Sequence, residues 1–293
     1  MRLDIIVNKQ ANFYFFAQNL SEWHFSNRKD YNTLWRKELG KFSDDEELAI
    51  KHLKKIHLRY SFGKSYLGRH FFLEENPWFF LKTRMAQEDF ITLKNIFSLL
   101  EDKFNLFWSK EAPLLLAWQK ELANKADDHL MIENIIELLK IIFNTNPSTS
   151  EVAINLLPSS PVHTGGGANI DSKNITLEIS RYPKQGTNHA MSLIWHEIIH
   201  LCFQEQYFSA LVSEKLPNDR QKADLINEIA IRSLFPRGIL GIRLFKEESR
   251  RKLIEETNPE QTVKIIDLAK EYVDDKKSFD NTYIEKILEI LKI

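Results

Sequence analysis

Residues 191–203 read MSLIWHEIIHLCF, an apolar run interrupted by two histidines and one glutamate. Apolar residues occupy most positions of the run, so the sequence predicts a helix that is buried on almost all sides. His196 and His200 are four residues apart and therefore lie on the same face of this helix, one turn from each other. Burying two imidazoles and a carboxylate is costly unless a metal ion or a polar partner satisfies them. The stretch therefore predicts a metal site within a helical region.

The spacing of these residues also suits a particular chemistry. Two neutral imidazoles on one helix face can bind the same zinc ion. Glu197 lies about 100° around the helix from His196, which places its carboxylate beside the metal ion rather than on it. From there it can accept a proton from a metal-bound water. The HExxH pattern is short, and two core histidines with ordinary hydrogen bonds are the alternative interpretation.

A catalytic zinc ion needs a third protein ligand and an open position for water. We predict that Glu228 is this ligand, because it lies within the apolar helical segment LINEIA, residues 225–230. Glu205 is less suitable, since five residues beyond His200 it points away from the metal face. The alternative interpretation of Glu228 is a surface ion pair with Arg232, four residues later on the same helix.

The motif HEIIH followed by NEIA on a later helix resembles the gluzincin class of zinc metallopeptidases, which combine HExxH with a glutamate from a downstream helix. The resemblance covers roughly residues 150–235. It implies a zincin-like catalytic region in which a sheet edge, here residues 166–169, holds extended substrate. The metzincin class is excluded, because Gln206 stands where its third histidine would be and Phe203 where its glycine would be.

The resemblance also implies roles for individual residues. Glu197 corresponds to the general base, and the zinc ligands correspond to His196, His200 and Glu228. Many gluzincins carry an aspartate four residues after the glutamate ligand, which orients a ligand histidine. This chain has Arg232 there. Asp224, one turn before Glu228, is the candidate replacement, and a solvent-facing aspartate is the alternative interpretation.

Peptide hydrolysis builds negative charge on the carbonyl oxygen, which zinc and a donor such as Tyr, His or Arg stabilise. The sequence leaves five candidate donors open: His163, His189, Tyr207, Tyr272 and Tyr283.

The whole chain is expected to be an α+β protein that is predominantly helical, with a helical region before a zincin-like catalytic region that holds a small sheet. Alternation or short apolar runs predict strands at residues 2–7, 152–157 and 174–180. Helical spacing predicts helices at about 87–108, 111–124 and 129–143. Further helices are expected from Ser43, from Asn188 to about Gln206, from Asn218 to about Phe235, from Asn258 and after Asp280.

The polar stretch NTNPSTS, residues 144–150, is the predicted linker. It divides the chain into a mostly helical region with a short first strand, residues 1–144, and a zincin-like region with C-terminal helices, residues 151–293. The two regions are also compatible with packing as a single unit. The Gly165–Gly167 run lacks the lysine and the spacing of a phosphate-binding loop, so a loop at a strand edge is the better interpretation.

Composition narrows the possible partners. Charged residues make up 28% of the 293 residues and the formal net charge is -1, so no strong attraction to nucleic acid or an anionic membrane is expected. No stretch of about 18 apolar residues and no signal-peptide pattern occurs, so a cytoplasmic protein without transmembrane helices is expected. The single cysteine, Cys202, is expected to be a core residue rather than a nucleophile or a metal ligand.

The sequence therefore predicts a zinc-dependent metallopeptidase that acts on a peptide or protein substrate, and it leaves the oligomeric state open. Two alternatives remain at this point. One is a non-catalytic helical protein-interaction module with a structural or vestigial zinc site, suggested by the long helical first half. The other is a zinc hydrolase of a non-peptide amide or ester.

Overall fold

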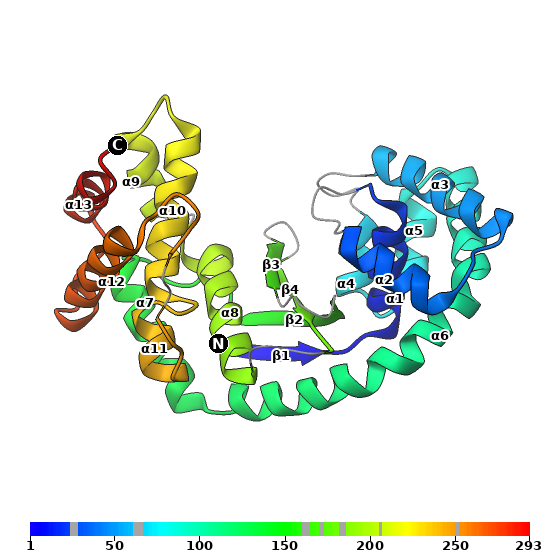
Figure 1. The fold of residues 1–293 in the computed structure, drawn as a ribbon, viewed down its shortest axis with the longest axis horizontal. Coiled ribbons are helices and arrows are strands. Elements are labelled where there is room, and N and C mark those ends of the chain that lie inside the picture. The colour runs from blue at the N-terminus through cyan, green and yellow to red at the C-terminus, as the bar shows by residue number, and fades with distance from the viewer. Residues whose placement is uncertain are drawn as a thin grey trace.

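The structure is a computed structural model of the chain, in which helices predominate around a small four-stranded mixed sheet. This arrangement confirms the predicted α+β class with mainly helical content. Figure 1 shows the sheet in the middle of the molecule, with helices on both sides of it. The structure describes residues 1–23, 29–60, 67–159, 165–169, 173–181, 186–204, 207–249 and 252–293.

The sheet joins the beginning of the chain to its middle. Its strands lie in the order β1 (Arg2–Ile6), β2 (Glu151–Pro158), β4 (Asn174–Ile179) and β3 (Gly165–Asn169). β2 is parallel to both β1 and β4, and β3 runs antiparallel to β4 at the edge of the sheet. The strands predicted at 2–7, 152–157 and 174–180 are confirmed. Because β1 pairs with β2, the sheet crosses the predicted division at residues 144–150.

Seven helices lie between β1 and β2 in the described part of the chain. The helix expected from Ser43 begins with the predicted capping box, in which the side chains of Ser43 and Glu46 each accept from the other residue's backbone N–H. The seven helices are α1 (Lys9–Ser21), α2 (Lys29–Leu39), α3 (Asp44–Arg59), α4 (Leu67–Leu73), α5 (Pro77–Arg84), α6 (Gln87–Ala126) and α7 (His129–Ile142).

Helix α6 is one helix of 40 residues, so the prediction of separate helices at 87–108 and 111–124 is wrong. Its buried positions keep helical spacing across the expected break, through Phe104, Phe107, Glu111 and Leu115. Pro113 lies inside this helix and cannot donate the usual backbone hydrogen bond. Packing along the buried face therefore holds the helix together where local sequence favours a break.

Helix α6 belongs to two hydrophobic cores. Its first half packs with α1 to α5 around aromatic side chains that include Phe16, Phe104 and Phe107. Its second half packs with α7, the sheet and the C-terminal helices, where Leu115 and Leu122 are fully buried. Figure 1 shows α6 curving along one side of the molecule from the first group of helices to the second. The helix thus fixes the distance between the two groups.

After the last strand, the described part of the chain consists of helices and the segments that connect them. The predicted C-terminal helices are confirmed, with Asn258 and Asp280 as their N-caps. Two expected caps are displaced, since Gly186 and not Asn188 precedes the histidine-bearing helix, and Asp219 and not Asn218 caps the next long one. The helices are α8 (Thr187–Ile199), the π-helical turn η3 (His200–Gln204), α9 (Phe208–Lys215), α10 (Arg220–Leu234), α11 (Ile239–Phe245), α12 (Pro259–Asp274) and α13 (Asn281–Leu291).

No helix in the described ranges has both the length and the apolar character needed to cross a membrane.

A buried ionic cluster connects the sheet to the first group of helices. Arg181 follows β4, and its guanidinium donates to Glu38 on α2 and to Glu111 on α6. Glu111 is fully buried, and this burial raises the pKa of its carboxyl despite the neighbouring guanidinium. A charge in such a place is stable only while its partner is present.

We predict that Arg181→Ala lowers the free energy of unfolding by about 3–5 kcal/mol, because it leaves the Glu111 carboxylate buried without a counter-charge. The matched control is Arg243→Ala, which removes a solvent-exposed pair with Asp274 and should change the free energy of unfolding far less, because water screens such pairs. Urea unfolding followed by circular dichroism measures both. Equal losses in the two variants would contradict the role given to this cluster.

Candidate metal centre

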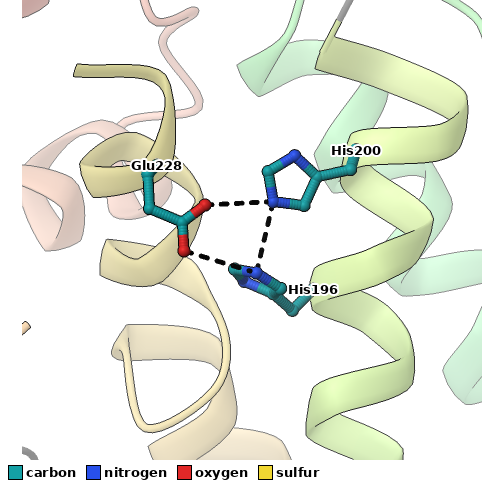
Figure 2. A group of neighbouring side chains, drawn as sticks. All are labelled: His196, His200 and Glu228. Atoms are coloured by element: carbon teal, nitrogen blue, oxygen red, sulfur yellow. Dashed lines mark hydrogen bonds and ion pairs between the residues drawn. The ribbon is translucent and has the colours of Figure 1, made fainter. Parts of the chain in front are cut away.

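Helix α8 and the turn that follows it carry the two histidines, as the sequence predicts. His196 and Glu197 are buried on α8, and His200 begins the π-helical turn η3. Glu228 lies on α10, which packs beside α8. Figure 2 shows the imidazoles of His196 and His200 and the carboxylate of Glu228 pointing toward one another from these two helices.

The three side chains are spaced as the ligands of one zinc ion would be. His196 Nε2 lies 3.2 Å from His200 Nε2. The Glu228 carboxylate oxygens lie 3.2 Å from His200 Nε2 and 3.7 Å from His196 Nε2. Ligand atoms at about 2.0–2.1 Å from a tetrahedral zinc ion are separated from one another by about 3.4 Å. The observed separations therefore fit a single small cation at their centre.

The hydrogen bonds of the other ring nitrogens explain why the Nε2 atoms turn toward this centre. His196 Nδ1 donates to the Phe235 carbonyl oxygen at 2.9 Å, and His200 Nδ1 lies 2.5 Å from Gln204 Oε1. A carbonyl oxygen only accepts, so the proton of neutral His196 sits on Nδ1 and its Nε2 presents a lone pair. The same geometry holds for His200. Both histidines are thus held in the tautomer that binds metal through Nε2.

Charges in the centre favour a bound cation. Burial lowers the pKa of His196 to about 3, so this ring is neutral. Burial works against the negative charge of Glu228, but the hydrogen bond with His200 and the charge of Arg232 outweigh it, and the pKa of Glu228 is held below its usual range. Burial also works against a charge on His200, yet the Glu228 carboxylate raises the pKa of that imidazole. A proton on His200 therefore competes with a metal ion.

Glu197 lies beside the three ligands and against the edge strand β3. Burial raises the pKa of its carboxyl, and the backbone N–H of Ala168 donates to it. A methyl group at Gly166 would lie 3.1 Å from Glu197 Cγ and 3.2 Å from Oε1. The absence of a side chain at residue 166 thus leaves room for the carboxylate between β3 and α8.

Arg232 acts on Glu228 directly. Its Nε donates to Glu228 Oε1, and its Nη1 donates to the Leu253 carbonyl oxygen at 3.2 Å. The ion pair that the sequence offered as an alternative to ligand binding is therefore present, and Glu228 contacts the histidines as well. The Glu228 carboxylate can make both contacts, because Arg232 approaches it along α10 while the histidines approach it from α8 and η3.

The prediction that Asp224 orients a ligand histidine is wrong. Its side chain is largely exposed and lies 4.0 Å from Arg220, so the solvent-facing interpretation holds. The Phe235 carbonyl orients His196 and the Gln204 side chain orients His200 instead, because each lies next to the Nδ1 atom of that ring. Helical spacing of four residues from His200 could have indicated Gln204, whereas no sequence signal marks a backbone carbonyl 39 residues away from His196.

The candidate oxyanion donors do not gather at the centre in the described part of the chain. Tyr283 is buried with its hydroxyl 3.1 Å from Ser233 Oγ, and the Tyr272 hydroxyl donates to Asp280 at 3.5 Å. His189 contacts Glu247 through Nδ1, and Tyr207 is half-buried before α9. His163 lies outside the described residues, as do Glu205 and Gln206. The oxyanion donor therefore stays unassigned.

A cavity gives the ligands access to solvent. It has a volume of about 750 Å³ and is bounded by His200 and Glu228 on one side and by polar residues of η3, α9 and α10 on the other, among them Gln204, Ser209 and Asn227. Cys202 lies nearby in sequence but is buried, and burial raises the pKa of its thiol to about 11. The thiol therefore stays protonated and unsuited to metal binding.

Comparisons with protein-family models, with curated proteins and with solved structures find no match for this chain. The account of the centre thus rests on its geometry, in which the described residues bring together one metal-binding group of His196, His200 and Glu228.

We predict that the protein binds one zinc ion and that Glu228→Ala weakens this binding by at least about 100-fold, because it removes the only anionic ligand among the described residues. Asp224→Ala is the matched control, since Asp224 lies one turn earlier on α10 and should leave zinc affinity unchanged. Competition with a chromogenic chelator measures both affinities. Full zinc affinity in Glu228→Ala would overturn the choice of third ligand.

We also predict that zinc affinity falls as the pH falls through the raised pKa of His200, by about tenfold per pH unit below it, because one proton must leave for each zinc ion bound. The pKa of His196 is about 3, so this ring adds nothing near neutral pH. Glu228→Gln removes the charge that raises the pKa of His200, so its affinity should begin to fall at a lower pH. Chelator competition between about pH 8 and pH 5 follows both proteins. An affinity that is independent of pH in this window would contradict the assignment.

Proposed function

We propose that this protein is a zinc-dependent hydrolase that cleaves peptide bonds. The observation that carries the proposal is a group of three possible metal ligands at tetrahedral separations, together with a buried carboxylate, Glu197, whose charge interacts with two of them, His200 and Glu228. A zinc ion bound there would lower the pKa of a coordinated water and polarise the substrate carbonyl. The arrangement supports the zincin-like character that the HEIIH motif implies.

In this proposal Glu197 acts as the general base. Burial raises the pKa of its carboxyl toward the pH at which it works, so it can take a proton and pass it on to the leaving amine. The Ala168 N–H holds one side of the carboxylate, and the bare backbone at Gly166 keeps the strand close to it. Glu197 is not one of the three converging ligands, which leaves it free to move a proton.

Two features favour catalysis over a purely structural metal site. A structural zinc ion usually has four protein ligands that close it off from water. Among the described residues only three groups converge here, and a cavity reaches two of them, His200 and Glu228. Among the described residues, none fills the fourth position, which suits a bound water.

The edge strand β3 favours a peptide substrate over another amide. β3 pairs with β4 on one side and ends the sheet, so its other edge can pair with an extended peptide backbone. The same strand touches Glu197, which brings such a peptide next to the base and the metal ligands. The polar cavity beside His200 has room for a substrate side chain.

The test is hydrolysis of a peptide library by the zinc-loaded protein, followed by mass spectrometry. We predict that Glu197→Gln keeps its zinc and its fold but loses at least about 100-fold in rate, because the amide cannot take the proton from water. Glu214→Gln, an exposed change on α9, is the control and should retain the wild-type rate. Undiminished hydrolysis by zinc-loaded Glu197→Gln would remove the base from the proposal. A wild-type protein that binds zinc and cleaves no peptide would favour the interaction module or a non-peptide substrate.

A further inference from the structure

Glu247 makes three hydrogen bonds that tie two parts of the C-terminal half together. It follows α11, and its side chain is buried. One carboxylate oxygen contacts His189 Nδ1 on α8. The other accepts from the Ser192 hydroxyl, also on α8, and from the backbone N–H of Arg237 at 2.7 Å. The carboxylate thus bridges α8 and the turn between α10 and α11.

This turn also supplies the partner of a metal-binding histidine. Phe235 follows α10, and its carbonyl oxygen accepts from His196 Nδ1. Arg237 lies two residues further on, with a φ of 60°, in the left-handed region that a non-glycine residue adopts at some cost. The turn is therefore attached to α8 at two points, through Glu247 at Arg237 and through His196 at Phe235.

The carboxylate has room because of one glycine. A Cβ at Gly241 would lie 2.3 Å from Glu247 Oε2 and 2.8 Å from Ser192 Oγ. Both of these are end atoms of side chains that could move aside, so an added methyl group would displace these acceptor and donor atoms rather than the backbone. Gly241 on α11 therefore allows the Glu247 bridge to form.

We propose that Glu247 is a positioning residue for the metal centre, and that it acts by holding the Phe235–Arg237 turn at the distance from α8 at which the Phe235 carbonyl fixes the His196 ring. This inference rests on the proposed binding of zinc by His196. None of the three hydrogen bonds of Glu247 goes to a ligand side chain, so it acts on the centre through α8 and the turn that it joins. Without the bridge, the turn keeps the hydrogen bond from His196 to Phe235 and the stacking of the Phe235 ring on Trp195, and the tautomer and ring orientation of His196 are less strongly held.

Groups that orient a ligand histidine typically change metal affinity by about 10–100-fold when they are removed. We therefore expect Glu247→Ala to weaken zinc binding by at least about tenfold. Glu247→Gln retains an amide oxygen that can accept from Ser192 and from Arg237 N–H, so it should restore most of the affinity. The control is Glu248→Ala, the adjacent and exposed glutamate, with wild-type affinity expected.

Gly241→Ala tests the same bridge while the carboxylate is retained. Its methyl group takes the place of Glu247 Oε2, so it should weaken zinc binding as Glu247→Ala does. This variant decides the question if Glu247→Ala fails to fold. The visible absorption spectrum of the cobalt(II)-loaded protein gives a second readout, because it reports the geometry of the ligands. The bands should shift in Glu247→Ala and Gly241→Ala and stay unchanged in Glu248→Ala.

The experiment separates this inference from the function on which it rests. If the wild-type protein binds neither zinc nor cobalt, the metal centre itself is wrong. If the wild type binds zinc, and folded Glu247→Ala or Gly241→Ala has the same affinity and the same cobalt spectrum, Glu247 is only a stabilising contact and the inference is overturned. Weakened binding in both variants, with recovery in Glu247→Gln, supports it.

Discussion

Three groups that carry lone pairs converge at the contact between α8 and α10, and this convergence is the constraint on which the rest of the site depends. Backbone and side-chain acceptors hold the Nδ1 protons of His196 and His200, so both Nε2 atoms face the Glu228 carboxylate within a few ångströms. Without a positive charge between them, the lone pairs of these groups repel one another. A proton on His200 relieves part of this cost, and a divalent cation relieves more.

Packed elements of the fold enclose this convergence on two sides. Helix α8 is packed against β3 and β4 on one side, and α10 and the turn after it close the other side. The sheet is joined to the first group of helices by the ion pair of Arg181 with Glu111 and by α6, whose side chains belong to both hydrophobic cores. The long helical first half thus supports the sheet whose edge strand touches Glu197. This gives the first half a structural part in the site.

The grouping of the three candidate ligands could be predicted from the sequence, because helix geometry alone brings His196 and His200 together and an apolar setting marks Glu228 as unusual. Three of the four described strands could also be predicted, from alternation or short apolar runs, whereas the Gly165–Gly167 run, which its sequence predicts as a loop at a strand edge, instead begins β3. The predictions failed where the structure depends on contacts between residues that are far apart in the sequence. The continuity of α6 past Pro113 depends on packing against distant residues, and the partner of His196 is a backbone carbonyl. Asp224 does not orient a ligand histidine, because its side chain, one turn before Glu228 on α10, is exposed to solvent.

X-ray absorption at the zinc edge tests the central claim most directly, because it reports the atoms bound to the metal. The account predicts a four-coordinate shell of nitrogen and oxygen at about 2.0–2.2 Å, with the outer-shell scattering of two imidazoles and room for one water oxygen. Loss of one imidazole contribution is expected in His200→Ala. A sulfur neighbour at about 2.3 Å, or a shell without imidazole scattering, would contradict the placement of the metal between His196, His200 and Glu228.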